Sequence, residues 1–162
     1  MNIEIINFEP KYREDFRKLN EEWLQKYFVV ENFDQHQLAN PESEILDKGG
    51  RIFFAKAGDQ IVGTASLLKE YDSYELAKMA GTETFKGHGI GNLLMKHCIE
   101  EAQKLGSEKV ILLSNRSLIP AIEMYKKFGF TEVTVDENTP YERCNIKMEL
   151  LFPKNYPKKS NL

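Results

Sequence analysis

The chain is poor in the residues that build disulfide frameworks and metal sites. Its 162 residues include two cysteines, Cys98 and Cys144, and three histidines, His36, His88 and His97. Two cysteines are too few for a disulfide framework, and both lie in apolar-patterned segments, so we expect reduced thiols in the core. Neither cysteine has a C-x-x-C partner and the histidines lack zinc-type spacing, which indicates that there is no metal site.

Long apolar runs and an excess of either charge are also missing. No apolar run approaches the roughly 20 residues that cross a bilayer. Residues 1–6 lack the basic and apolar regions of a secretory signal. The 22 basic and 25 acidic residues give a formal net charge of −3. A protein that binds nucleic acid typically carries a clustered excess of basic residues. We therefore expect a soluble, cytoplasmic protein that binds no nucleic acid and no membrane.

The apolar patterning divides the chain into an antiparallel half and a β-α-β half. In the first half we expect a hairpin at Gly58-Asp59 and strands at 3–8, 51–57, 61–68 and 74–80. Between the first two strands we expect a helix that begins near Pro10 and two shorter helices, one capped by Asp34-x-x-Gln37 and one by Asn40. The second half is expected to contain helices at 92–105 and 120–128 and strands at 110–113, 130–135 and 144–152.

This order of elements indicates an α+β fold around one mixed, strongly twisted sheet. We expect about seven strands, flanked by about four to five helices, in a single domain over residues 1–152. Residues 153–162 are polar and interrupted by proline, which is typical of a solvated extension. A cover over a partner subunit or over the substrate mouth is the alternative for this tail, and the protein is expected to be a monomer or a homodimer.

Three glycines lie within five residues, at Gly87, Gly89 and Gly91, directly before the amphipathic segment 92–105. Glycine allows the positive φ angles of a tight turn and leaves little side chain between the backbone and a ligand. The following helix would present unpaired amides and the positive end of its dipole at this turn, which favours a phosphate or pyrophosphate. The alternative is a glycine-rich turn before a core helix.

Two common phosphate-binding loops do not fit this segment. A Walker loop needs Lys-Ser or Lys-Thr after its last glycine, whereas Asn92 follows Gly91 here. The dinucleotide fingerprint follows an N-terminal strand and has an acidic residue at the end of the next strand. This loop lies in the middle of the chain, and the strand 110–113 ends in Ser114. We therefore expect a different pyrophosphate ligand.

Further motifs follow the glycine loop. Lys86-x-x-Gly89-x-Gly91 precedes an amphipathic helix, an apolar strand at 109–113 and the segment Tyr125-Lys-Lys-Phe-Gly-Phe130. Residues 74–135 thereby resemble the GNAT superfamily of acyl-CoA-dependent N-acyltransferases. The resemblance implies a GNAT-like fold and acetyl-CoA as the cosubstrate, without a metal.

The resemblance also implies which residues contact acetyl-CoA. The strands before and after the loop helix are expected to splay apart, so that the pantetheine arm lies in the gap. Backbone groups would pair with this arm at Met79, Ala80 and Gly81, and core filling is the alternative for the first two side chains. The other implied contacts are Lys86, Gly87, His88, Gly89, Ile90, Gly91, Asn115 and Ala121. Lys86 stands where the family more often has Arg or Gln, yet it still supplies a cation.

Tyr125 is the candidate general acid. The resemblance implies that its hydroxyl lies near the thioester sulfur, where it can protonate the departing thiolate. The alternative is that Tyr125 packs beside Phe128 and Phe130 as a core residue. Asn115, which ends the strand, either hydrogen-bonds the pantetheine amides or serves as a turn residue.

A general base is needed because a free amine is protonated at neutral pH. Some relatives carry a glutamate on the strand after the loop helix, but residues 111–114 contain none. Glu75 is the candidate base, acting through water, with a solvated strand residue as the alternative. Glu142 is the reserve, and its pair with Arg143 could instead bind a charged substrate.

These expectations favour transfer of an acetyl group from acetyl-CoA to a primary amine, in a small molecule or a peptide. Direct attack is expected because no cysteine lies beside a histidine in the mapped site. The alternative is a non-catalytic CoA-binding or sensor module of the same fold, and a small interaction domain would bind no CoA at all. The acceptor is expected to contact residues 27–50 and the last hairpin.

Overall fold

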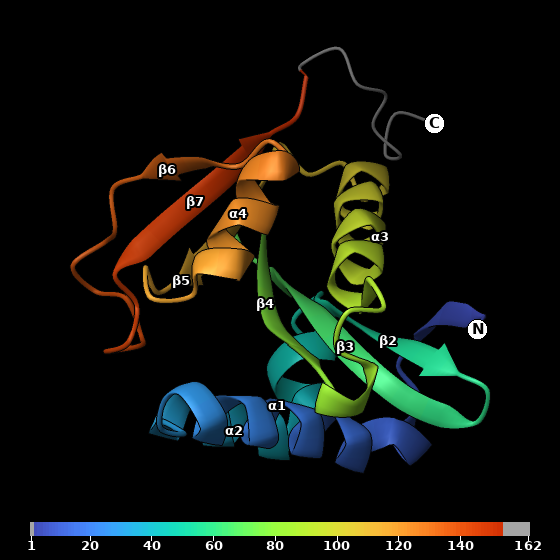
Figure 1. Ribbon diagram of the computed structural model, residues 1–162. Coiled ribbons are helices and arrows are strands. Elements are labelled where there is room, and N and C mark those ends of the chain that lie inside the picture. Colours follow the sequence, from blue (N-terminus) through green and yellow to red (C-terminus); the bar gives the residue numbers. More distant parts are fainter. Residues whose placement is uncertain (1, 154–162) are drawn as a thin grey trace.

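One mixed sheet forms the centre of the computed structural model, which describes residues 2–153 (Figure 1). Its seven strands lie in the order β1-β2-β3-β4-β5-β7-β6. They are β1 (Ile3–Asn7), β2 (Arg51–Ala57), β3 (Gln60–Lys69), β4 (Tyr74–Gly81), β5 (Lys109–Ser114), β6 (Thr131–Val133) and β7 (Ile146–Leu151). Neighbouring strands are antiparallel except for β4 and β5, which are parallel.

Helices cover both faces of this sheet. Between residues 2 and 153 they are α1 (Arg13–Tyr27), α2 (Asn32–Ala39), α3 (Ile90–Lys104) and α4 (Ile119–Lys127), with shorter turns η1 (Pro10–Tyr12), η2 (Glu42–Leu46) and η3 (Glu83–Phe85). In Figure 1, α1 and α2 lie below the sheet and α3 and α4 above it. The expected α+β architecture, with its mixed seven-stranded sheet, is confirmed. Most of the expected polar tail, residues 154–162, lies outside the described residues.

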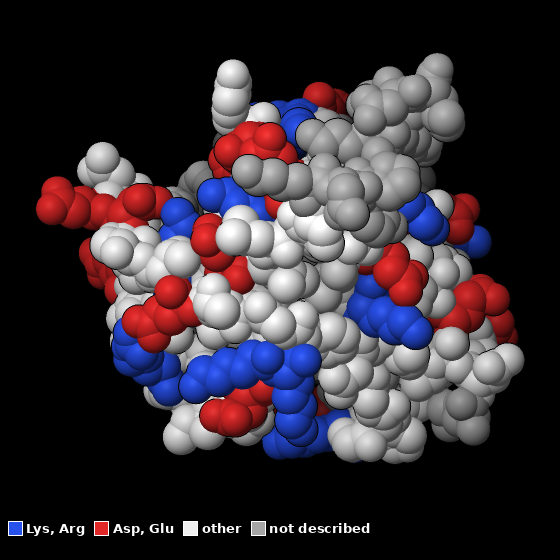
Figure 2. All heavy atoms as spheres, turned by 90° about the horizontal axis from the view of Figure 1, so that it is seen from above, with Lys and Arg blue, Asp and Glu red and all other residues white. Residues whose placement is uncertain are grey.

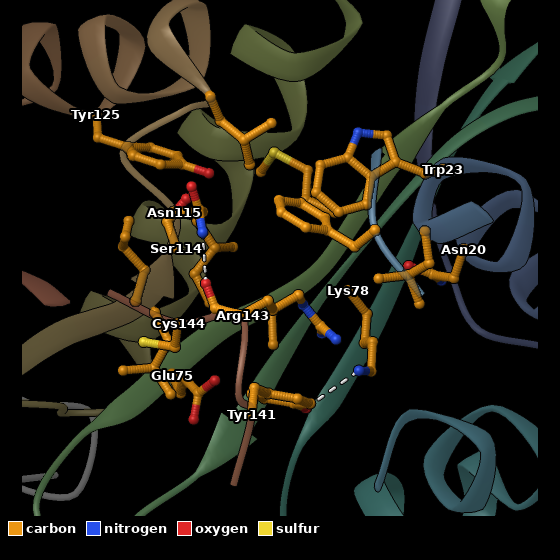
Figure 3. A pocket seen from close by; sticks show the side chains of 18 residues that line it. Asn20, Trp23, Glu75, Lys78, Ser114, Asn115, Tyr125, Tyr141, Arg143 and Cys144 are labelled. Atoms are coloured by element: carbon orange, nitrogen blue, oxygen red, sulfur yellow. Dashed lines mark hydrogen bonds between the residues drawn. The ribbon is translucent and has the colours of Figure 1, made fainter. Parts of the chain in front are cut away.

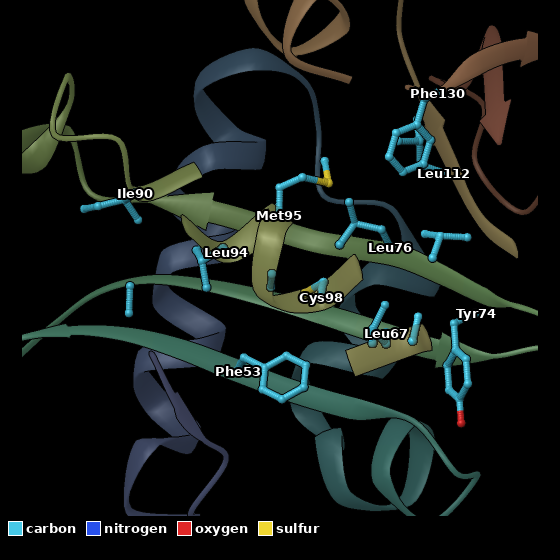
Figure 4. Packing of buried hydrophobic residues seen from close by; sticks show 14 of the residues in the cluster. Phe53, Leu67, Tyr74, Leu76, Ile90, Leu94, Met95, Cys98, Leu112 and Phe130 are labelled. Carbon is cyan, nitrogen blue, oxygen red and sulfur yellow. The ribbon is translucent and has the colours of Figure 1, made fainter. Parts of the chain in front are cut away.

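The core consists of two apolar layers, one on each face of the sheet. Successive side chains of a strand point to opposite faces, so that Phe53 and Phe54 of β2 are both buried but belong to different layers. Phe53 packs in the layer that contains Leu94 and Cys98 of α3 (Figure 4). Phe54 packs in the layer that contains Phe16 of α1. The central strands are therefore apolar on both sides, as expected for a sheet with helices on both faces.

Several local expectations differ from the structure. The cap of α2 is Glu31, whose backbone N–H donates to the carboxylate of Asp34 at 3.0 Å, so the box predicted to begin at Asp34 is wrong by three residues. Asn40 ends α2, and its side-chain amide donates to the carbonyl of His36. The next helical segment begins directly after it at Pro41, as expected, with the carbonyl of Asn40 accepting from the N–H of Glu44 at 2.9 Å, but the side chain of Asn40 does not cap it. Cys144 precedes β7 and is half-buried, whereas Cys98 is a core residue as expected.

The surface carries charges of both signs. On the face shown in Figure 2, acidic and basic side chains are interspersed among neutral ones. No helix within residues 2–153 is both long and apolar enough to cross a membrane. The same residues contain no group of three or more His, Cys, Asp or Glu side chains placed to hold a metal ion.

Candidate active site

The two parallel strands at the middle of the sheet separate after a short ladder. β4 and β5 pair from Tyr74 with Val110 to Leu76 with Leu112. β4 continues to Gly81, and in the described part of the chain no strand pairs with its free edge beyond Leu76. The splay that the family resemblance implied is therefore present, and it exposes unpaired backbone groups along one edge of β4.

A β-bulge lies in β4 just beyond the splay point. Ser66 of β3 pairs with Ala77 and Thr64 pairs with Ala80, so two residues of β4 lie opposite the single residue between Thr64 and Ser66. One of these two is Lys78, which has a φ of 52° and is the one non-glycine residue with positive φ between residues 2 and 153. A bulge bends its strand and redirects its side chains. It turns Lys78 toward a group of polar side chains beside the gap.

A pocket occupies the gap between the two strands (Figure 3). Four parts of the chain line it besides β4 and β5, namely the C-terminal half of α1, the segment before α4, Tyr125 of α4 and the loop 141–144. The lining includes Phe28 and the loop before β7, where we expected the acceptor to bind. It also includes Asn20, Trp23 and Leu24 of α1, which sequence reasoning did not assign to the site.

The glycine loop follows β4 through η3 and leads into α3. Gly87 and Gly89 have φ values of 88° and 75°, and a Cβ atom added to either would meet no atom within 4 Å. Packing therefore does not require glycine there; the backbone conformation does. Within residues 2–153, the amides of Gly87, Gly89 and Gly91 donate to no other group. Open space, free amides and a helix N-terminus together fit a pyrophosphate.

The remaining residues of this loop differ in their surroundings. Lys86 is exposed. Nδ1 of His88 lies 3.0 Å from the carbonyl oxygen of Phe85, so the imidazole closes the turn on itself. Ile90 is 7% exposed and packs in the core against Gly63, where a Cβ atom would come within 2.6 Å of it. Ile90 can therefore offer a ligand its backbone amide but not its side chain.

The other residues implied to contact acetyl-CoA are divided between the pocket and its surroundings. Met79 and Asn115 line the pocket, whereas Ala80, Gly81 and Ala121 are not among the residues that form its wall. Ala80 is 4% exposed and belongs to the core layer beneath the sheet. Core filling is therefore the role of its side chain, and a backbone contact with the cofactor stays a prediction.

The side chain of Asn115 is engaged in two hydrogen bonds within the protein. Its amide donates to the carbonyl of Arg143 at 2.7 Å, and its oxygen accepts from the backbone N–H of Ser117 at 2.9 Å. These contacts are those of a turn residue, the second of the two alternatives. They also tie the end of β5 to the loop before β7.

Tyr125 packs against the core and also reaches the pocket, and its role as general acid stays a prediction. Its ring packs against Phe130, with centroids 6.1 Å apart. Its hydroxyl points into the pocket beside Ser114 (Figure 3). Burial raises the pKa of Tyr125 above its ordinary value, and the contact with Ser114 offsets part of this effect. The phenol is therefore held in its protonated form, as a proton donor must be.

Glu75 is not a solvated strand residue, so that alternative is wrong. It lies on β4, is 8% exposed and lines the pocket. Burial and the nearby charge of Glu70 raise its pKa to about 7, while Lys78 and Lys147 act in the opposite direction. Desolvation favours the neutral form of a carboxylic acid. A carboxyl group with a pKa near neutrality can accept and release a proton under physiological conditions.

Glu142, the reserve base, is exposed and does not line the pocket. Its backbone N–H donates to Oε1 of Glu31 at 3.0 Å. Arg143 does not pair with Glu142. Instead it pairs with Glu31 at 3.2 Å and with Asp34 at 2.7 Å. The expected acid–base pair of adjacent residues is therefore replaced by contacts to α2.

Asp34 is the centre of a buried ion cluster beside the pocket. Its carboxylate is fully buried and accepts from both terminal nitrogens of Arg143, at 2.7 and 2.8 Å, and from Nζ of Lys78. Although burial opposes ionisation, hydrogen bonds from Arg143 and the charge of Lys78 hold the pKa of Asp34 below its ordinary value. The ion cluster joins α2, the bulge in β4 and the loop before β7.

Tyr141 lies between the two cations of this cluster. Nζ of Lys78 and the guanidinium of Arg143 lie 4.9 and 4.2 Å from the centroid of its ring. Its hydroxyl accepts from Lys78 at 3.1 Å and donates to Gln37 at 3.1 Å. Sequence reasoning missed Asp34, Lys78 and Tyr141. One signal was available, because a lysine between the apolar residues Ala77 and Met79 in the middle of a strand needs a partner if it is buried.

Most of the pocket wall lies within a region of the chain that matches a known protein family. The model of the acetyltransferase (GNAT) family matches residues 11–130. The chain belongs to this family. The match spans α1, the splayed strands, the glycine loop and α4, so it includes most of the pocket wall.

Relatives of this GNAT protein support the same assignment. The N-acetyltransferase YvbK of Bacillus subtilis is 31% identical over 112 residues, which are 67% of this chain and 72% of YvbK. The N-acetyltransferase C1271.07c of Schizosaccharomyces pombe is 28% identical over 130 residues, 75% of this chain and 77% of its own. The resemblance inferred from the glycine loop and the segment 125–130 is confirmed.

Solved structures confirm the fold. A GNAT acetyltransferase from Staphylococcus aureus MU50 has a TM-score of 0.81 at 22% identity, over 91% of this chain and 98% of its own. The PaiA N-acetyltransferase of Thermoplasma acidophilum, solved in complex with coenzyme A, has a TM-score of 0.73 at 19% identity, over 94% of this chain and 100% of its own.

Proposed function

We propose that this GNAT protein transfers an acetyl group from acetyl-CoA to a primary amine by direct attack. The observation that supports this most strongly is the pocket in the β4–β5 gap, into which Glu75 and Tyr125 project from different elements. The glycine loop offers free amides for the pyrophosphate, and the unpaired edge of β4 offers backbone groups for the pantetheine arm. The acetyl group that acetyl-CoA supplies would thus be presented between a base and an acid.

Glu75 would remove the proton from the ammonium group of the acceptor, through a water molecule. The amine nitrogen must carry a free lone pair to attack the thioester carbon. A carboxylate with a pKa of about 7 is suited to this transfer because it is ionised at or slightly above neutrality. As the new carbon–nitrogen bond forms and the carbon–sulfur bond breaks, Tyr125 would donate its proton to the departing sulfur.

Cys144 lines the pocket, so a covalent route through this thiol is the competing mechanism. Its Sγ lies 3.5 Å from the carbonyl oxygen of Ile146, to which it donates. An activated cysteine needs an adjacent base, but none of the side chains that line the pocket is a histidine, and within residues 2–153 no hydrogen bond joins Cys144 to Glu75. Direct attack therefore needs fewer assumptions.

The test combines acetyl-CoA with a panel of amines and measures the release of CoA thiol together with the acetylated product. With the best acceptor, Glu75→Gln should lower kcat/KM by about 10²–10⁴ near neutral pH. Much of this loss should return at high pH, where more of the amine is already neutral. Glutamine keeps the size of the side chain but cannot accept the proton.

A second variant, Glu142→Gln, tests whether the loss in Glu75→Gln comes from proton transfer or simply from the removal of a negative charge. Glu142→Gln should leave kcat/KM unchanged, because Glu142 is exposed and does not line the pocket. An equal loss for Glu75→Gln at all pH values would indicate substrate positioning instead of proton transfer. Binding of CoA without turnover of any amine would favour the non-catalytic CoA-binding module.

A further inference from the structure

The two cations beside the pocket are already neutralised by carboxylates of the protein itself. Lys78 and Arg143 both line the pocket, and their side chains are 4% and 18% exposed. Arg143 binds both oxygens of Asp34 and one oxygen of Glu31, while Lys78 binds Asp34. Two positive charges thus face two negative ones within one cluster, and little net positive charge remains for a substrate.

The carboxyl group of Glu75 has no such partner. Between residues 2 and 153, no hydrogen bond or salt bridge to its side chain is present, although it is 8% exposed and lines the pocket. Asp34 and Glu31 do not line the pocket themselves, but they pair with the two cations that do, so the ion cluster as a whole carries no net charge. Glu75 adds either no charge or one negative charge to this balance. An ammonium group can approach such a wall, whereas a carboxylate placed there would be buried without a counter-ion.

Apolar side chains from the end of α1 line the pocket on the side of Lys78 (Figure 3). Trp23, Leu24 and Phe28, from the end of α1, line the pocket, and the rings of Trp23 and Phe28 have centroids 5.8 Å apart. In Figure 3, Trp23 and Lys78 lie on one side of the pocket and Ser114 and Glu75 on the other. An acceptor whose nitrogen reaches Glu75 can therefore place an apolar or aromatic body against α1.

From this balance we infer that the acceptor is a primary amine with an apolar or aromatic body and with no carboxylate beside the nitrogen. The inference rests on the proposed function and narrows its substrate class. It excludes free α-amino acids as good acceptors, because Arg143, the arginine among the residues that line the pocket, is already paired with Asp34 and Glu31.

The direct test compares 2-phenylethylamine with phenylalanine, which share the aromatic body and differ by the carboxylate. We expect kcat/KM to be about 10- to 100-fold higher for 2-phenylethylamine, since a buried charge without a partner is costly. The nitrogen of 2-phenylethylamine is the more basic one, so its protonation works against this order and cannot produce it. Equal values, or faster turnover of phenylalanine, would overturn the inference.

A variant tests whether the internal carboxylates cause this preference. Glu31→Gln keeps an oxygen that can accept from the backbone of Glu142 but removes one of the charges that neutralise Arg143. The preference for 2-phenylethylamine over phenylalanine should fall by about 2- to 5-fold, mainly through a lower KM for phenylalanine. Glu42→Gln, which removes the partner of Arg13 away from the pocket, should leave the preference unchanged.

The outcomes separate this inference from the proposed function. If phenylalanine is acetylated as fast as 2-phenylethylamine or faster, or if the preference is unchanged in Glu31→Gln, the inference is contradicted. The proposed acetyltransferase activity is not affected by either result. Asp34→Asn also removes one negative charge, but one that contacts both Lys78 and Arg143, so the preference should fall further than in Glu31→Gln. The comparison of the two acceptors with the unaltered protein does not depend on whether that variant folds. Absence of acetylation for every amine contradicts both.

Discussion

Replacing Glu75 with glutamine is expected to stabilise the folded protein at neutral and alkaline pH while it removes the candidate base. The pKa of this carboxyl group is raised from 4.5 to about 7, first by burial and then by Glu70. The folded state therefore binds the proton more tightly than the unfolded state does. The stabilisation that comes from this tighter proton binding at Glu75 is fully present below pH 4.5 and is lost as the pH rises through 7.

The size of this effect follows from the two pKa values. Each pH unit between them corresponds to about 1.4 kcal/mol. At pH 8, ionisation of Glu75 thus lowers the free energy of unfolding by about 3 kcal/mol, whereas the loss at pH 5 is below about 1 kcal/mol. For a chain of this length, about 3 kcal/mol corresponds to a change in Tm of roughly 6–12 °C. Glutamine is neutral at both pH values and avoids this loss.

Thermal or urea unfolding of the unaltered protein and of Glu75→Gln, at pH 5 and pH 8 and without ligand, measures the difference. All other titrating groups are common to both proteins. The difference in their free energies of unfolding should therefore change between pH 5 and pH 8 only through the ionisation of Glu75. Glu142→Gln should show no such change in the stability difference between pH 5 and pH 8, because Glu142 is exposed. A stability difference that is the same at both pH values would refute the argument, and so would a lower stability of Glu75→Gln at pH 8.

Two further predictions concern the acid and the glycine loop. Tyr125→Phe should lower turnover by about 10²–10⁴ and leave CoA affinity nearly unchanged, as measured by steady-state kinetics and calorimetry; acetylation at the unaltered rate, with chemistry limiting, would assign Tyr125 to packing alone. Gly91→Ala should keep or raise stability by up to about 1 kcal/mol, because Gly91 lies in the first turn of α3 and an added Cβ comes no closer than 3.6 Å to Met124. The same change should weaken CoA binding about 10-fold through loss of close backbone approach, and unchanged affinity would place the pyrophosphate elsewhere.

The parts of the fold that depend on local signals could be predicted from the sequence. The helix expected at 92–105 is observed at Ile90–Lys104, and the strand expected at 74–80 is observed at Tyr74–Gly81. Apolar periodicity and glycine at turns determine such elements over a few neighbouring residues. The glycine loop follows from the same local patterns, whereas the position of Tyr125 in the pocket was implied by the resemblance to the GNAT superfamily.

The ion cluster could not be predicted in this way. Asp34 lies 44 residues from Lys78 and 109 residues from Arg143 along the chain. Charged residues at such separations carry no periodic signal that would pair them. The left-handed backbone conformation at residue 78 could not be predicted either, because a lysine occupies this position instead of the usual glycine or asparagine. The burial of Glu75 depends in turn on elements that these long-range contacts bring together.

The short ladder between β4 and β5 gives the sheet a seam. Three residue pairs join the antiparallel block β1–β4 to the block formed by β5, β7 and β6. Beyond the third rung, the pocket takes the place that further backbone hydrogen bonds would occupy. The pocket in this gap is lined by residues of both blocks, so a ligand bound there would contact both. Such a ligand would add contacts between the two blocks to the three residue pairs that join them in the sheet, and we therefore expect it to stabilise the folded protein.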